Sequence, residues 1–148
     1  MPSAMPFGLK IAIINRAFRK KMDEKAAAMG LTSVQLRVLG SISRLEAAGT
    51  EEIHQNDLER IEHVTHPAMT KLLQRLEAKG FVRCAPGRQD RRCKRVCCTE
   101  KSAGIHTMIL EQDAQTLREL CAGFTPEQAA RLEELCDLLL KAIDRSTV

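Results

Sequence analysis

The sequence predicts a mainly helical fold that carries one small β-hairpin. Over most of the chain, apolar residues recur at three- and four-residue steps, which is typical of amphipathic helices. Two short apolar runs, residues 81–84 and 95–98, break this period and indicate strands. Aromatic residues make up only 3% of the 148 residues, with no Trp or Tyr. The core must therefore be built from aliphatic residues, Met and Cys, which favours packing of helix on helix.

The first two helices are predicted from an apolar seam and from residues that end helices. The first runs from about Phe7 to Met29 and stops at Gly30, with a seam of Phe7, Ile11, Ile14, Phe18 and Met22. The second opens at Thr32, where Gln35 completes a capping box. Gly49 ends it, and its buried stripe is predicted to be Leu31, Val34, Val38, Ile42 and Leu45.

Two short helices joined by a tight turn come next. The first covers residues 55–61 and the turn residues 62–64. The second starts near Thr65 or His66, tolerates Pro67 in its first turn, and is capped by Gly80. Such a pair is typical of a helix-turn-helix. Its shared core is predicted to be Leu58, Ile61, Val64, Met69, Leu72 and Leu76.

The two predicted strands follow this pair directly, with turn residues between them at 86–90. The connecting loop is basic and lacks apolar residues, so we expect it to project into solvent or onto an acidic partner. A hairpin in this position turns a helix-turn-helix into a winged helix.

The remaining helices carry more apolar surface than a winged helix needs. Thr99 is predicted to cap a long helix whose apolar residues are Ile105, Ile109, Leu110, Ala114, Leu117, Leu120, Cys121 and Phe124. Thr125 and Gln128 form a second capping box, and the last helix has a stripe of Leu132, Leu135, Cys136, Leu139, Ala142 and Ile143. The surplus is most simply buried against a second copy of the chain, and packing back onto the monomer is the alternative.

Charge is concentrated in one segment. Residues 65–95 hold nine Lys or Arg and two acids, a balance of +7, whereas the rest of the chain holds fourteen basic and seventeen acidic residues, a balance of −3. A mixed solvated surface would not gather its charge in this way. The concentration is typical of phosphate contact and predicts binding of double-stranded DNA.

The predicted contacts fall on the helix after the turn and on the wing. On the helix they are Thr65, His66, Ala68, Thr70, Lys71, Gln74 and Arg75, the first half reading base edges and the last two residues reaching phosphates. On the wing they are Arg88, Asp90, Arg91, Arg92, Lys94 and Arg95. Asp90, the lone acid there, is predicted to form an ion pair that shapes the loop. A solvated charge run on a bare hairpin is the alternative.

The six cysteines all lie in the second half of the chain, unlike the spread of disulfides in secreted scaffolds, which indicates a reducing cytoplasm. Four of them are candidate redox sensors, because nearby arginines would favour the thiolate: Cys84, Cys93, Cys97 and Cys98. Small core hydrophobes are the favoured interpretation, and Cys121 and Cys136 are assigned to helical stripes. His54 and His63 are predicted to be exposed turn residues.

Several functional classes lack support. The sequence has no nucleophile–base pairing, phosphate loop or metal spacing, so neither catalytic residues, a cofactor nor a metal site is expected. No run is long and apolar enough for a membrane span, and residues 1–5 lack the start of a secretory signal. A dimeric adaptor that does not bind DNA explains the apolar seams but leaves the basic segment without a role.

The chain resembles the MarR/SlyA family of bacterial regulators. The most specific stretch is Leu76-Glu77-Ala78-Lys79-Gly80-Phe81-Val82-Arg83, followed by Asp90-Arg91-Arg92 and Val96-Cys97-Cys98-Thr99-Glu100-Lys101. It is similar to the family's "LE-x-KG-(L/F)-V-x-R … D-x-R … V-x-L-T-x-K" signature in order and spacing. Phe124-Thr125-Pro126-Glu127-Gln128 is similar to the start of the family's last helix.

This resemblance implies a homodimer that binds an inverted-repeat operator, in which Asp90 braces Arg92 and Arg91 or Arg92 enters the minor groove. It also implies a repressor released by a small aromatic or phenolic effector, bound between the dimer region and the DNA-reading heads. The chain departs from the family at three positions: His54 replaces a capping Ser or Thr, Glu59 a small residue, and Cys98 a strand Leu.

The predicted fold class is thus mainly α, an α+β winged helix. One MarR-like unit spans 1–148, with a winged helix-turn-helix DNA-binding region at 31–99 and a helical dimerisation region at 1–30 and 100–148. The predicted function is a cytoplasmic, sequence-specific transcription regulator. A cysteine-based redox-sensing regulator of the same fold is the alternative.

Overall fold

The computed structural model of the chain describes the backbone of residues 4–146 and the side chains of residues 4–143. Residues 1–3 and 147–148, which the predicted dimerisation region includes, lie outside the described residues. The chain forms two compact units that divide after Asp113. Each unit is described by itself below.

The first two helices lie where the sequence predicts them. Helix α1 spans Phe7–Ala28, and α2 spans Ser33–Ala47. Gly30, which follows α1, has the left-handed φ of 72° that favours glycine. The Thr32–Gln35 capping box is present: the Gln35 N–H donates to Thr32 Oγ1 at 3.1 Å, and the Thr32 N–H donates to Gln35 Oε1 at 3.0 Å.

The buried face of α2 is wider than the predicted stripe. Leu36 and Leu39 are buried beside the expected Val38 and Ile42, whereas Val34 is 39% exposed. The prediction that Val34 is buried was therefore wrong. The buried face of α2 is wide because the helix contacts α1, α3 and the sheet. A helix enclosed in this way buries residues beyond a single heptad stripe.

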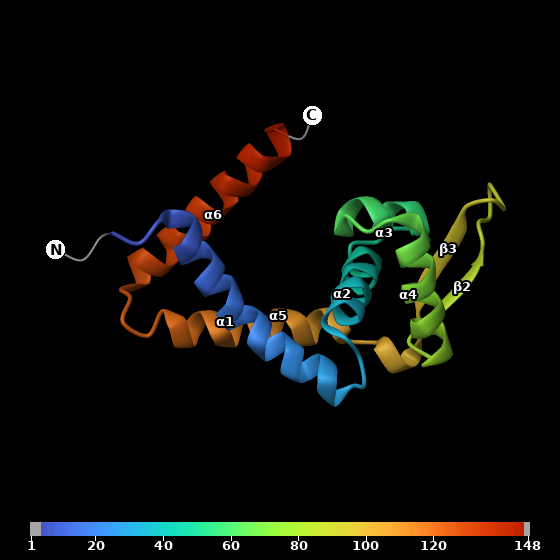
Figure 1. Cartoon of the computed structure of the whole chain (residues 1–148), viewed down its shortest axis with the longest axis horizontal. Helices are drawn as coiled ribbons and strands as arrows, with labels where there is room; N and C mark the ends of the chain where they lie inside the picture. The colour runs from blue at the N-terminus through green and yellow to red at the C-terminus, as the bar shows by residue number, and fades with distance from the viewer. Residues whose placement is uncertain (1–3, 147–148) are drawn as a thin grey trace. The chain divides into compact units, whose positions relative to one another are not determined.

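The helix-turn-helix consists of α3, Gln55–Glu62, and α4, His66–Ala78, which lie against each other (Figure 1). His63 in the turn has φ of 51°, a left-handed conformation. Leu58 and Met69 are fully buried, as predicted. On α4 the fully buried leucine is Leu73, whereas Leu72 is only half-buried. Ile61, predicted to be core, is 41% exposed.

The wing is an antiparallel hairpin of β2, Val82–Pro86, and β3, Lys94–Cys98. Pro86 pairs with Lys94 at the end of β2, so the loop proper is residues 87–93 rather than 86–90. A third strand, β1 at Ile53–His54, pairs with β3 and gives the sheet order β1-β3-β2. Two residues are too few for a period-2 pattern, so β1 could not be predicted from its residues.

Thr99 does not cap the long helix. It precedes a short 3₁₀ helix, η1 at Glu100–Ser102, and α5 begins only at Ile105, after Gly104 with φ of 82°. The Thr99 hydroxyl donates to the Gly80 carbonyl at 2.6 Å, and the buried Ser102 hydroxyl donates to the Phe81 carbonyl at 2.6 Å. Thr99 and Ser102 therefore join the chain after the wing to the end of the helix-turn-helix.

The second unit contains the end of α5, which spans Ile105–Leu120, and α6, which spans Pro126–Ser146. Cys121 and Phe124 lie beyond the end of α5, contrary to the prediction that the helix reaches them. The second capping box is confirmed: the Gln128 N–H donates to Thr125 Oγ1 at 3.2 Å, and the Thr125 N–H donates to Gln128 Oε1 at 2.9 Å.

Two helices carry rows of large apolar side chains that this single chain leaves exposed. On α6 they are Leu135, Leu138, Leu139, Leu140 and Ile143, and on α1 they are Phe7, Leu9, Ile11, Ile13 and Ile14. None of the helices within residues 4–146 combines the length and apolar character needed to cross a bilayer.

Candidate nucleic-acid interface

The outward face of α4 presents most of the predicted reading residues. Thr65 lies at the N-cap, and its side chain and those of five other predicted residues are exposed: His66, Ala68, Lys71, Gln74 and Arg75. The inner face of the helix is fixed by Met69, Leu73 and Leu76, which are buried in the core. The core therefore sets which side of α4 is available to a partner.

Thr70 differs from its neighbours on α4. It is half-buried, and its hydroxyl donates to the His66 carbonyl at 3.0 Å while it accepts from the Gln55 amide at 2.8 Å. Since the hydroxyl hydrogen is used within the helix, Thr70 cannot donate it to a base. The structure thus gives Thr70 a role in joining α3 to α4, a role that its sequence position did not indicate.

The wing loop presents its guanidinium groups to solvent. Arg88, Arg91, Arg92 and Lys94 are exposed, whereas Arg95 is half-buried. The Arg95 Nε atom is buried without a hydrogen-bond partner in the described part of the chain. The loop residues and not Arg95 are therefore the most accessible positive charges of the wing.

Asp90 shapes the wing loop through the backbone. One of its carboxylate oxygens accepts the Arg92 N–H at 3.0 Å, and the other accepts the Cys93 thiol at 3.7 Å. None of the ion pairs among the described side chains involves Asp90. The prediction that Asp90 forms an ion pair is therefore wrong among the described side chains: Asp90 braces the main chain at Arg92 and does not pair with its guanidinium.

Gly87 is the tightest point of the wing. Its N–H donates to the Cys93 carbonyl at 2.7 Å, and the Cys93 N–H donates to the Asp90 carbonyl at 3.0 Å. A Cβ atom at position 87 would lie 2.5 Å from the Cys93 carbonyl oxygen and closer still to that of Asp90. Since both neighbours are backbone atoms, only glycine fits, and the sequence showed Gly87 merely as a turn residue.

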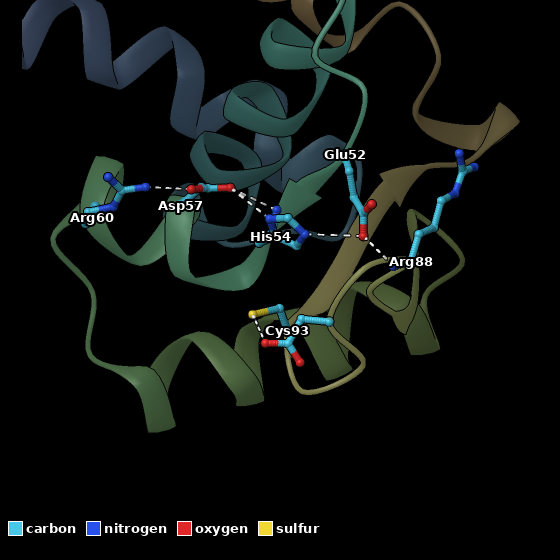
Figure 2. Close-up of polar contacts among 7 residues, drawn as sticks. Glu52, His54, Asp57, Arg60, Arg88 and Cys93 are labelled. Carbon is cyan, nitrogen blue, oxygen red and sulfur yellow. Dashed lines mark hydrogen bonds and ion pairs between the residues drawn. The ribbon is translucent and has the colours of Figure 1, made fainter.

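The wing loop is anchored to the start of α3 by residues that the sequence analysis missed (Figure 2). Glu52 Oε1 accepts the Arg88 N–H at 2.9 Å and lies 3.2 Å from His54 Nε2. On its other side His54 faces Asp57: the backbone N–H of His54 donates to Asp57 Oδ2 at 3.1 Å, and its Nδ1 lies 3.6 Å from the same oxygen. Asp57 in turn pairs with Arg60 at 2.5 Å.

This chain of contacts corrects the prediction that His54 is an exposed turn residue. His54 is half-buried and is the N-cap of α3, with Asp57 at the third helical position. The i, i+3 spacing of His54 and Asp57 resembles a capping box and was the one signal available in the sequence. The contact from Glu52 to Arg88 spans 36 residues and had no local signal.

Comparison with known proteins agrees with this geometry. The sequence model of the MarR family matches residues 29–92. The Multiple antibiotic resistance protein MarR of Salmonella typhimurium is 28% identical over 137 residues, which cover 92% of each chain. The reduced form of E. coli MarR has a TM-score of 0.76 at 27% identity, over 93% of this chain and 98% of that one.

These comparisons support a MarR-family winged-helix regulator. The winged-helix fold and the mainly helical class are confirmed, and MarR-family proteins are transcription regulators and not enzymes. A cysteine-to-serine mutant of E. coli MarR, complexed with operator DNA, has a TM-score of 0.70 at 28% identity, over 92% of this chain and 94% of that one.

The cysteines of this chain do not have the environment expected of thiolates. Partial burial raises the pKa of the Cys84, Cys93 and Cys98 thiols, that of Cys98 to about 11. Nearby carboxylates raise these pKa values further: Glu77 at Cys84, Asp90 at Cys93 and Glu46 at Cys98. The expectation that neighbouring arginines favour the thiolate is therefore wrong for these three.

Cys97 is the exposed member of the four candidates, and its thiol donates to the Arg83 carbonyl at 3.8 Å. All six cysteines are free thiols. Within the described residues, no group of three or more His, Cys, Asp or Glu side chains is arranged to hold a metal ion.

The anchor between Glu52 and the wing gives a prediction for the pH dependence of the wing loop. The Arg88 N–H holds the pKa of Glu52 below its ordinary value, and His54 lowers the pKa further. Because the folded-state pKa is depressed, the anchor is fully present above the ordinary pKa of glutamate and is lost as the pH falls through the lower, folded value. We expect the Arg88 amide proton resonance to titrate with a midpoint below that of an ordinary glutamate.

An NMR titration of the ¹⁵N-labelled protein measures this midpoint. In a Glu52→Gln variant the same transition of the Arg88 amide should disappear, which serves as the control. A midpoint at or above the ordinary value for glutamate would contradict the anchor.

Proposed function

We propose that this regulator binds an inverted-repeat duplex as a homodimer, with α4 in the major groove and the wing loop along the backbone or in the neighbouring minor groove. The observation that carries the proposal is the placement of the charged segment. Residues 65–95 have a balance of +7. The core holds the inner faces of α4 and the hairpin, and the cations exposed on these two adjoining elements include Lys71, Arg75, Arg88, Arg91, Arg92 and Lys94. A polyanionic duplex neutralises such a surface.

Within this surface, different side chains are proposed to contact base edges, phosphates and the minor groove. His66, Ala68 and Lys71 lie in the first half of α4, where a helix in the major groove meets base edges. Gln74 and Arg75 lie further along α4 and suit phosphates. The loop arginines, which Asp90 leaves free, suit a narrow and electronegative minor groove.

The homodimer is supported by apolar surface that the single chain does not bury. Rows of large apolar side chains are exposed on α1 and α6, and exposed apolar patches commonly mark an interface with another protein chain. We assign residues 1–30 and 100–148 to the dimer and residues 31–99 to DNA reading. Two-fold symmetry would then present two reading heads to an inverted repeat, with half-sites about 34–36 Å apart.

The release of the regulator from DNA is proposed to follow binding of a small aromatic effector. The first unit contains a cavity of about 580 Å³ between α1, α2 and α5, a volume that suits a small-molecule ligand. Phe18, Met22 and Ile109 supply apolar walls, and Arg37 and His106 supply polar groups. An effector held there would act on the spacing of the two reading heads, and the outcome is repression relieved by the ligand. The free thiols suit a reducing cytoplasm.

The proposal is tested by the salt dependence of duplex binding. Each phosphate contact contributes to the slope of log affinity against log salt concentration. Arg92→Ala should weaken binding to every duplex sequence and lower the slope by about one contact. Arg131→Ala removes an exposed arginine from α6 and serves as the control with an unchanged slope. Equal affinity and slope for Arg92→Ala and wild type would overturn the role of the wing, and absence of any duplex binding would favour the adaptor.

A further inference from the structure

Four side chains from α3 and α4 form a connected network at the start of the reading helix. The Glu59 carboxylate lies 2.5 Å from His66 Nδ1. The Gln55 amide nitrogen donates to Thr70 Oγ1 at 2.8 Å and to Glu59 Oε1 at 3.2 Å. Gln55 is only 4% exposed and the Glu59 side chain 17%, whereas the His66 side chain is 69% exposed. The inner members of the network are thus fixed, and the imidazole is held at the surface.

The number of hydrogens available in the network determines which ring nitrogen of neutral His66 carries its proton. The two amide hydrogens of Gln55 are used by Thr70 and Glu59, so none remains for Nδ1, although that atom lies 3.3 Å from the amide nitrogen. An ionised carboxylate only accepts, so the hydrogen between Glu59 and His66 belongs to Nδ1. In a neutral imidazole the outer nitrogen, Nε2, then carries a bare lone pair. Within the described part of the chain no hydrogen bond is made to Nε2.

We propose that Glu59, supported by Gln55, makes His66 a hydrogen-bond acceptor. His66 then selects an amino-bearing base, cytosine or adenine, at one position in each half-site. The inference rests on the proposed function, since His66 must face the major groove. In that groove an acceptor pairs with the amino group of cytosine or adenine, and it is repelled by the O6 and N7 acceptors of guanine. His66 is the reading residue and Glu59 the positioning residue.

The network also accounts for a carboxylate on the DNA-facing side of the helix-turn-helix. An exposed glutamate there would repel phosphate, but the Glu59 carboxylate is largely covered and accepts hydrogen bonds from both Gln55 and His66. A small residue at position 59 could not reach His66, so the preference for an amino-bearing base depends on the glutamate.

The first test needs no DNA. Long-range ¹H–¹⁵N spectra of protein labelled at histidine distinguish the two neutral tautomers, and a His66→Ala variant identifies the His66 signals. At a pH where the imidazole is neutral, we expect wild type to hold the proton on Nδ1 and Glu59→Ala to shift it toward Nε2. Finding His66 protonated on Nε2 in wild type would overturn the inference even if the protein binds DNA.

The second test measures base preference. From duplexes randomised within a bound fragment, wild type should prefer cytosine or adenine at one position per half-site, by roughly tenfold over guanine. His66→Ala and Glu59→Ala should both lose this preference at the same position. Glu62→Ala is the matched control, because Glu62 is also an acid of α3 but contacts Arg37 and Ser41 on α2.

The outcomes separate the two proposals. A preference for guanine, or a Glu59→Ala variant that keeps the wild-type preference, overturns the role of the Glu59–His66 pair and leaves the DNA-binding function intact. Failure of wild type to bind any duplex overturns both. Thermal unfolding of each variant shows whether it is folded, and the tautomer spectra of wild type decide the question if Glu59→Ala does not fold.

Discussion

Replacing Gly87 with alanine is expected to lower the affinity for duplex DNA by at least about tenfold while the helical core stays folded. The added Cβ would lie 2.5 Å from the Cys93 carbonyl oxygen, a backbone atom that cannot rotate away. The loop must then open, which breaks the hydrogen bond from the Gly87 N–H to Cys93 and displaces Arg88, Arg91 and Arg92. Loss of their contacts is the reason for the weaker binding.

Gly123→Ala is the matched control, because a Cβ atom at Gly123 meets nothing within 4 Å. Duplex affinity is measured by fluorescence anisotropy at one fixed salt concentration, and circular dichroism reports the helix content of both variants. If Gly87→Ala binds as tightly as Gly123→Ala, the wing loop does not contribute to DNA binding in the conformation described.

Leu39→Ala is expected to lower the free energy of unfolding by about 2–5 kcal/mol, the range for a leucine removed from a packed core. Leu39 is fully buried in α2 among residues from the helices and the sheet. A loss of this size is a large part of the total stability of an ordinary domain. Val34→Ala, on the same helix but at a side chain 39% exposed, is expected to cost less than about 1 kcal/mol.

Denaturant unfolding followed by circular dichroism, at matched protein concentrations, compares the two variants. Similar losses of unfolding free energy for Leu39→Ala and Val34→Ala would contradict the packing of α2. They would mean that Val34 is as buried as Leu39.

Elements with local signals could be predicted from the sequence. The capping boxes at Thr32 and Thr125 mark the starts of α2 and α6 through bonds between residues three apart. Gly30 and Gly49 mark helix ends because they adopt left-handed φ values. The error at Thr99 has the same origin, since a capping residue cannot show whether a 3₁₀ helix or an α-helix follows it.

Features that depend on distant partners could not be predicted. Strand β1 exists because Ile53 pairs with Val96, and the wing is anchored because Glu52 meets Arg88. The raised pKa of Cys98 reflects burial and the neighbouring Glu46, which a count of nearby arginines in the sequence cannot reveal.

The candidate site could be predicted only in part, because some of its features have local signals and others depend on a distant partner. Helical periodicity is enough to place His66, Lys71 and Arg75 on the outer face of α4. It is not enough to show that the Thr70 hydroxyl is occupied, because its partner Gln55 lies on another helix.

The most direct test of the central claim is a hydroxyl-radical footprint of the protein on a duplex selected from genomic fragments. The proposed dimer predicts two protected patches, related by two-fold symmetry and centred about one helical turn apart, roughly 34–36 Å. Each patch should cover the backbone that flanks the major groove read by α4 and the adjoining backbone reached by the wing. A single asymmetric patch, or uniform cleavage across the duplex, would contradict binding by a symmetric pair of winged helices.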